Sequence, residues 1–495
     1  METIASINAA INNFVWGIPA MVCILGIGLY LSIRTGFIQI RKFGLAMKET
    51  FGKIFSKDQT AEGAISPFQA LCTALAATVG TGNIAGVAGA IAIGGPGAIF
   101  WMWVCALFGM ITKFAEATLA LRYRVRNSTG DFVGGPMYMI QNGLQKRWHW
   151  LAYVYSFFGV IAAFGVGNAT QINAVISGVN EVVAYFGGTP GKNIDLVIGI
   201  GLAVLVSLML LGGAKRIGAL AEKMVPFASV AYLLLGIGVL IVCRHRLPDA
   251  LSQIVGGACS PAAVTGGMVG SALVAMRTGI ARGVFTNEAG MGTASIAHAS
   301  AKVRHPVEQG MMGIVEVFVD TIVICTMTAL VILCSGVNIP YGKDPGAALT
   351  TQAFAVVYGG WVSVVLTAAL CCFAFATVLG WGLYGIRCAE YLFGIGAIRI
   401  FALLQAVVVV LGAILETKTV WLLSETVNGL MAVPNLIALA VLSPELIRLI
   451  KEFRSKSGAM AAGGGTYENF NQRKSLRTVS YAEVPSAGGG GQEAW

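Results

Sequence analysis

Eleven apolar segments constrain this chain more than any other feature of its sequence. Several exceed the stretch of about 20 residues that a membrane-spanning helix needs. Of the 495 residues, 56% are hydrophobic and only 11% are charged, whereas soluble domains carry about 25% charged residues. The sequence therefore predicts an all-α integral membrane protein with about 11 transmembrane helices. The predicted spans are roughly 14–33, 66–93, 97–121, 150–186, 194–212, 222–243, 262–285, 308–335, 355–386, 399–415 and 419–442.

Lys and Arg residues are distributed unevenly between the segments that join these spans. With the N-terminus outside, the outer loops hold only five of the 33 Lys and Arg residues, and cytoplasmic segments hold most of the others. Cytoplasmic loops of membrane proteins are enriched in these residues. We therefore expect a multi-pass protein of the cell membrane with its N-terminus outside and its C-terminus in the cytoplasm. The same bias accounts for the net charge of +10, so no nucleic-acid partner is expected.

The order of the spans divides the chain into four parts. Residues 1–65 hold an extra N-terminal helix and a cytoplasmic linker, and 66–243 and 262–442 hold five spans each. Because five is an odd number, the second unit is inverted in the membrane relative to the first. The polar, Gly-rich composition of 457–495 predicts a disordered cytoplasmic tail.

The second span has a polar, Gly-containing middle, Val79-Gly80-Thr81-Gly82-Asn83. Gly costs about 1 kcal/mol in a helix interior, and a lipid-facing helix cannot leave backbone groups unpaired. A break is tolerated where it lines a cavity, and there freed amides can bind an anion and freed carbonyls a cation. Taken alone, this segment favours a binding site and a continuous helix with Gly for close packing about equally.

A second Gly-containing interruption is predicted at 275–283, and it places Arg277 at membrane depth. Paired interruptions that open two inverted repeats indicate the binding site of a secondary transporter. The loop Asn287-Glu288-Ala289-Gly290 follows. We expect it to shape the cytoplasmic gate and to lie outside the substrate site.

Two acids, Glu316 and Asp320, lie four residues apart on one face of the eighth span. A structural pair with Arg277 or Lys113 is favoured over a proton relay or a second cation path, because buried charges are costly unless paired. The ten Cys and four His are dispersed without metal-ligand spacing. No nucleophile–base or metal cluster is visible, so an enzyme is not expected.

Five runs are similar to the alanine/glycine:cation symporter family, and this resemblance extends from Asn12 to about Lys451. It implies a fold like that of the bacterial leucine transporter, with ten core helices in an inverted 5+5 repeat and here one extra N-terminal helix. The runs are TALAATVGTGNIAGVAGAIAIGGPGAIFWMW (73–103), GGPMYMI (134–140), TNEAGMGTASIAHASAK (286–302), EVFVDTIVICTMTALVIL (316–333) and FAFATVLGWGLYG (373–385).

The resemblance assigns roles at the first interruption, where this chain carries the family's V-G-x-G-N pattern. The amides of Thr81 and Gly82 are implied to bind the substrate carboxylate. The carbonyls of Ala76 and Val79 are implied to bind a structural Na⁺. The side chain of Asn83 resembles a ligand of a second Na⁺ beside the substrate.

Other helices complete the implied site. Thr377 matches the family's hydroxyl ligand for the first Na⁺, one turn after the Phe373 carbonyl, and Trp381 is expected to form a wall over a small side chain. A second hydroxyl often precedes such a Thr in this fold, but here that position is Ala376, so one oxygen ligand is absent or replaced.

Three further residues are implied to face the substrate. The Gln171 amide could bind its carboxylate or ammonium group, or else join two helices by a hydrogen bond. Met276 and Thr278 would contact the substrate from the second interruption, although Met276 could equally serve ordinary packing.

The function that the resemblance implies is sodium-coupled symport of small neutral amino acids, alanine and glycine, into the cell by alternating access. Na⁺ would be the co-transported ion. The alternatives left open are a proton-coupled or uncoupled amino-acid carrier, possibly for glutamine or serine, and a channel. The sequence predicts no oligomeric state.

Overall fold

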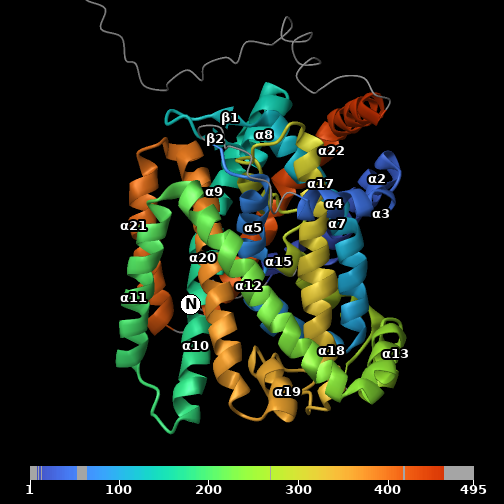
Figure 1. The fold of residues 1–495 in the computed structure, drawn as a ribbon, viewed down its shortest axis with the longest axis vertical. Coiled ribbons are helices and arrows are strands. Elements are labelled where there is room, and N and C mark those ends of the chain that lie inside the picture. The colour runs from blue at the N-terminus through green and yellow to red at the C-terminus, as the bar shows by residue number, and fades with distance from the viewer. Residues whose placement is uncertain are drawn as a thin grey trace, which may run out of the picture. The chain divides into compact units, whose positions relative to one another are not determined.

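The structure, a computed structural model, describes residues 8, 10–12, 14–52, 64–267, 269–415 and 418–461. These residues are helical almost throughout (Figure 1). The helices of the first half are α2 (Ile18–Thr35), α3 (Ile38–Arg41), α4 (Phe43–Phe51), α5 (Pro67–Thr78), α6 (Val87–Gly94), α7 (Gly97–Tyr123), α8 (Pro136–Gly143), α9 (Trp150–Phe164), α10 (Thr170–Tyr185), α11 (Lys192–Leu210) and α12 (Gly213–Val242). The later helices are α13 (Leu247–Gly257), α14 (Pro261–Thr265), α15 (Ala272–Asn287), α16 (Thr293–His298), α17 (Pro306–Val317), α18 (Thr326–Ser335), α19 (Ala348–Tyr358), α20 (Val362–Phe393), α21 (Ala397–Ile414) and α22 (Lys418–Ala461).

Shorter elements connect or interrupt these helices. Two short strands, β1 (Val125–Arg126) and β2 (Phe132–Val133), form an antiparallel hairpin with Val125 opposite Val133. Two 3₁₀ turns cover Lys146–Trp148 and Arg244–Arg246. Three wider, π-helical turns cover Gly82–Gly86, Gly165–Ala169 and Phe318–Cys325. Turns of this kind occur frequently at functional sites.

Eight helical stretches of the described chain are long and apolar enough to cross a membrane, and α5 with Gly82–Gly94 makes a ninth if this pair, bent by 51°, is one span. Two of the predicted spans are shorter in the structure, namely α2 and the 16-residue α15. The count of eleven therefore stays a prediction. The eight stretches are Gly97–Tyr123, Lys146–Tyr185, Lys192–Leu210, Gly213–Val242, Pro306–Ser335, Val362–Phe393, Ala397–Ile414 and Glu425–Ser455.

The helices differ in how much of their apolar surface the protein itself buries. α11 and α21 run side by side (Figure 1), and only 22% and 33% of their apolar windows are buried, against 67% for α7. The exposed side chains of α11 and α21 include Val197 and Leu403. Such surfaces suit lipid, whereas α7 lies inside the protein between α15 and α17.

The first interruption is at the predicted position. α5 begins with a capping box, in which Ser66 accepts a hydrogen bond from the Gln69 amide and Gln69 accepts one from the Ser66 amide, with Pro67 as the first helical residue. It ends at Val79, whose backbone is extended (φ −77°, ψ 102°). The chain resumes a helical path with the π-helical turn that begins at Gly82.

The second interruption lies later than predicted. α15 is continuous through 275–283, so the predicted position is wrong. Gly279 and Gly283 instead let α15 approach α7, because a Cβ on either would press against α7 atoms. The chain leaves the helix at 288–292, where Gly290 and Gly292 have φ of 94° and 78°. These left-handed conformations favour Gly.

The β1–β2 hairpin is fixed beside the end of α16. Arg124 donates hydrogen bonds to the carbonyls of Ala299 and Ala301, at 2.9 and 2.6 Å. Ser300 donates one to the carbonyl of Phe132 at 3.2 Å. The hairpin therefore ties the segment after α16 to the first half of the chain.

The predicted linker and tail are described only in part. Residues 53–63 and 462–495 lie outside the described residues. α22 continues to Ala461, past the predicted start of the tail at 457. By their contacts, Met1–Ile447 form one compact unit and Arg448–Trp495 a second one.

Candidate functional site

The first interruption is held open by the side chain of Asn83. Its Oδ1 accepts a hydrogen bond from the amide of Gly80 at 2.8 Å, which satisfies one backbone group freed by the break. Its Nδ2 donates to Oδ1 of Asp320 at 2.7 Å and to the Asp320 carbonyl at 3.2 Å. Asn83 thus joins the break to the π-helical turn that precedes α18. The Na⁺ role implied for Asn83 remains a prediction.

Three oxygen atoms converge on one side of this break. Oγ1 of Thr377 lies 2.9 Å from the carbonyl oxygen of Ala76 and 3.0 Å from that of Phe373. A hydroxyl carries one proton and can satisfy only one of these carbonyls at a time. A Cβ added at Gly80 would lie 2.7 Å from the same Oγ1. The structure therefore brings together Ala76, Phe373 and Thr377. The Na⁺ role that the resemblance implies for them remains a prediction.

Gln171 faces the same break from α10. Thr81 donates its hydroxyl hydrogen to Oε1 of Gln171 at 3.1 Å, and Nε2 of Gln171 donates to the Val166 carbonyl at 3.1 Å. Two amide groups of the predicted carboxylate site, those of Thr81 and Gly82, lie at the start of the second half-helix. Gln171 and the break thus form one polar corner.

Met276 and Thr278 do not lie at the level of the first break. The α15 residues beside Gly82 are Phe285 and Thr286, whose side chains lie 3.6 and 3.1 Å from the position of a Gly82 Cβ. Thr278 precedes Thr286 by eight residues, which is about 12 Å along a helix. It packs instead against Gly94, at the end of α6. Phe285 and Thr286 were not predicted from the sequence, because the second break was expected earlier in the chain.

A cleft of about 300 Å³ extends from Phe285 along α15. Arg282 lines it, with its guanidinium 3.3 Å from a carboxylate oxygen of Asp344 and 3.5 Å from one of Glu425. Arg277 lines this cleft as well. The other lining residues are Asn12, Trp16, Ile93, Val274, Thr278 and Ala281.

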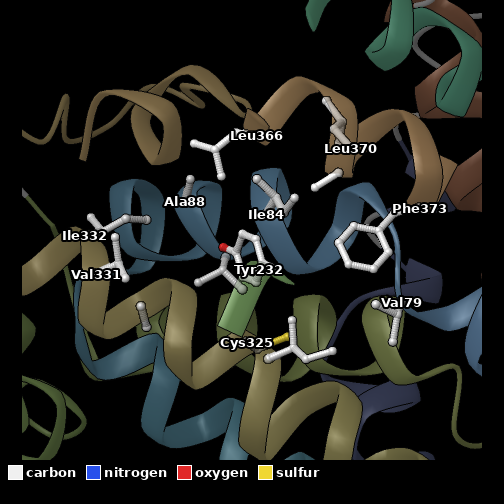
Figure 2. Packing of buried hydrophobic residues seen from close by; sticks show 14 of the residues in the cluster. Val79, Ile84, Ala88, Tyr232, Cys325, Val331, Ile332, Leu366, Leu370 and Phe373 are labelled. Carbon is white, nitrogen blue, oxygen red and sulfur yellow. The ribbon is translucent and has the colours of Figure 1, made fainter. Parts of the chain in front are cut away.

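Val79, Ile84 and Phe373 point into a large buried cluster of apolar side chains around Tyr232 (Figure 2). The Tyr232 hydroxyl is satisfied by Thr328 at 2.7 Å. This side of the break is therefore lined by apolar side chains. An ion or a zwitterion bound there would depend on the polar groups already named, because apolar side chains cannot replace its hydration.

The second break carries an acid that the sequence argument placed outside the substrate site. Glu288 is buried, with φ of 53°, and its Oε1 accepts a hydrogen bond from the indole nitrogen of Trp381 at 2.8 Å. Its Oε2 accepts one from the hydroxyl of Thr293 at 2.5 Å. The loop expected to shape the cytoplasmic gate thus reaches the residue expected to form the wall of the pocket.

Glu316 forms the predicted structural pair with Lys113. The Lys113 Nζ lies 3.3 Å from Oε1 of Glu316, and both side chains are fully buried. The ring of His298 donates from Nε2 to the other oxygen of Glu316 at 2.8 Å, because its Nδ1 accepts from Gln309. Asp320 is held instead by Asn83 and by the hydroxyl of Thr321 at 2.8 Å.

Glu116, which was not predicted from the sequence, holds the backbone of the second break. It accepts hydrogen bonds from the amides of Gly290 and Gly292 at 2.8 and 3.1 Å, and from Nδ2 of Asn435 at 2.8 Å. The carboxylate thereby satisfies the backbone of the second break. Its signal in the sequence was an acid within the apolar span 97–121.

The fold of this chain is similar to that of a solved structure. The crystal structure of MhsT in complex with L-phenylalanine matches with a TM-score of 0.56 at 15% identity, covering 77% of this chain and 90% of that one. This likeness confirms the predicted all-α fold of the leucine-transporter type.

The family is shown by sequence. Residues 1–463 match the sodium:alanine symporter family, and the chain belongs to that family. It is a multi-pass transporter and not an enzyme, as predicted. The sodium/alanine symporter AgcS of Methanococcus maripaludis is 43% identical over 459 residues, which cover 92% of this chain and 98% of that protein. The probable sodium/glutamine symporter GlnT of Bacillus subtilis is 36% identical over 454 residues, covering 90% of each chain.

Proposed function

We propose that this protein couples Na⁺ to the uptake of small neutral amino acids, alanine and glycine, by alternating access. The observation that supports this most directly is the convergence of Thr377 Oγ1 with the carbonyls of Ala76 and Phe373 beside a broken helix. Similarity to a protein named as a sodium/alanine symporter supports the choice of ion and substrate.

The substrate carboxylate and Na⁺ would each be received by their own groups of the site. The amides of Thr81 and Gly82 begin a half-helix, and a helix N-terminus attracts a carboxylate. The carbonyls of Ala76 and Val79, with Thr377, would hold Na⁺. Because Gly80 separates these two sets by one residue, ion and substrate would fix the same stretch of backbone.

That shared backbone gives a physical route to coupling. An ion shifts a conformational equilibrium only if it binds one state better than another. Na⁺ held between α5 and α20 would favour the state in which the two helices are close together. In that state the break is ordered and ready to bind the amino acid.

Uptake would be driven by the inward Na⁺ gradient, and the predicted orientation places the N-terminus outside and the C-terminus in the cytoplasm. The cleft along Phe285 would then open outward. Asn83 would be a ligand of a second Na⁺ beside the substrate, and Gln171 would contact the substrate itself.

The test is uptake of [³H]alanine into proteoliposomes that contain the purified protein. We expect accumulation driven by an inward Na⁺ gradient, lost when choline replaces Na⁺, and reduced by excess glycine. Uptake that follows an imposed proton gradient without Na⁺ would favour a proton-coupled carrier. Strong competition by glutamine or serine, with weak competition by glycine, would redefine the substrate. Flux without accumulation under any gradient would refute coupled transport.

A further inference from the structure

We propose that Glu288 sets the upper size limit of the substrate side chain by holding the indole of Trp381 in place. This inference rests on the proposed function, because it concerns which amino acids that transporter accepts. Glu288 is here a positioning residue that acts through Trp381.

The hydrogen bonds of Glu288 leave its carboxylate little freedom. One oxygen accepts from Trp381 at 2.8 Å and the other from Thr293 at 2.5 Å. Glu288 is 3% exposed and Trp381 is 1% exposed, so water does not compete for either bond. The indole is therefore fixed at its polar end.

The other end of Trp381 is fixed by packing. A Cβ at Gly167 would overlap the Cβ of Trp381, so α20 approaches the π-helical turn of Gly165–Ala169 as closely as Gly allows. The ring also packs edge-on against Tyr384, with centroids 5.7 Å apart. Trp381 is thus packed between the π-helical turn of Gly165–Ala169 and Tyr384 of its own helix.

The clamped ring lies one turn from the polar corner at the first break. Trp381 follows Thr377 by four residues on α20, which places the two side chains on one face. Gly167 lies one turn before Gln171, which contacts Thr81. A side chain that extends from a substrate bound at Thr81 in this direction meets the indole. If the indole were released, the space available to the substrate side chain would be longer.

A purely structural role for Glu288 makes a different prediction. In that case its loss would weaken folding or slow transport of every substrate by the same factor. A size-setting role changes the ratio between small and large substrates. The two are separated by competition between amino acids of graded size.

The experiment measures inhibition of Na⁺-driven [³H]alanine uptake by glycine, serine, valine, leucine and phenylalanine. Trp381→Phe lacks the indole N–H, and Glu288→Ala lacks its acceptor. In both variants we expect the inhibition constants of valine and leucine to fall at least about tenfold relative to the half-saturating concentration of alanine. Glu288→Gln keeps a carbonyl acceptor for the indole and should retain the wild-type profile. The double variant Glu288→Ala/Trp381→Phe should show no larger change than either single variant.

Trp103→Phe is the matched control. The indole of Trp103 donates to Oγ1 of Thr326 at 2.8 Å, away from the second break, so its loss should leave the size profile unchanged. An unchanged profile in Trp381→Phe overturns the proposal even if Glu288→Ala does not fold. An equal shift for all competitors in Glu288→Ala also overturns it. Absence of Na⁺-driven alanine uptake in the wild-type protein would instead refute the proposed function.

Discussion

Replacing Lys113 by Met should destabilise the protein, because it leaves the buried carboxylate of Glu316 without its cation. Both side chains are 0% exposed and their charged atoms are 3.3 Å apart. Met is similar in length to Lys, so the change removes charge with little loss of packing.

The size of the effect follows from what remains around Glu316. Removing one partner of a buried ion pair costs about 3–5 kcal/mol. The His298 ring still donates to Glu316 at 2.8 Å, and a hydrogen bond to a charged group contributes about 1.5–3 kcal/mol. We therefore expect the lower end, about 3 kcal/mol. Glu316→Gln in the same background should recover much of this loss, because it removes the uncompensated charge.

The assay is reversible unfolding of the purified protein in mixed micelles with increasing SDS, followed by circular dichroism. Arg122→Met is the control, since Arg122 pairs with Glu445 at 2.8 Å but is 46% exposed. Exposed pairs contribute at most about 1 kcal/mol. If Lys113→Met costs no more than Arg122→Met, or if Glu316→Gln does not rescue it, the reasoning about the buried pair is wrong.

Three further variants test the first break and its surroundings. Thr377→Ala should raise the half-saturating Na⁺ concentration of alanine uptake at least tenfold while Thr377→Ser does not; an unchanged value would remove Thr377 from the ion site. Gly80→Ala should abolish Na⁺-driven uptake, because its Cβ would lie 2.7 Å from the Thr377 hydroxyl oxygen; normal uptake would show that the two helices separate easily. Gly167→Ala should destabilise the protein by about 1–3 kcal/mol through overlap with Trp381, and unchanged SDS unfolding would contradict this packing.

Much of the fold could be predicted from sequence because the bilayer simplifies the problem. Apolar runs of about 20 residues can only be helices in lipid, so the all-α class followed directly. The position of the first break followed from Gly80 and Gly82, which stand beside two hydrogen-bonding side chains. Family resemblance then indicated a partner for this break on α20.

The second break was misplaced for a definite physical reason. Gly residues in a membrane helix serve either a break or close helix packing, and local sequence does not separate the two uses. Gly279 and Gly283 face α7, which only the packed structure reveals. Gly290 and Gly292 take left-handed conformations whose amides are satisfied by Glu116, a residue 174 and 176 positions away in the chain.

The residues of the candidate site also fall into those that the sequence indicated and those that only the structure placed. Ala76, Phe373 and Thr377 could be named from motifs, and the structure brings them together. Met276 and Thr278 were inferred from the misplaced break and lie about two turns or more from Phe285 on the same helix. Glu288 was assigned to a gate, although it contacts the buried Trp381.

By itself, the sequence determined that the chain spans the membrane as helices and that one helix could be interrupted at Gly80. Hydropathy and backbone hydrogen bonding are local properties, and they act on each segment independently of its neighbours. Only the tertiary structure decided which buried polar and charged groups meet. Lys113 pairs with Glu316 and Glu288 bonds to Trp381 because distant helices are packed together, and the energy of a buried charge depends on the atoms within a few ångströms of it.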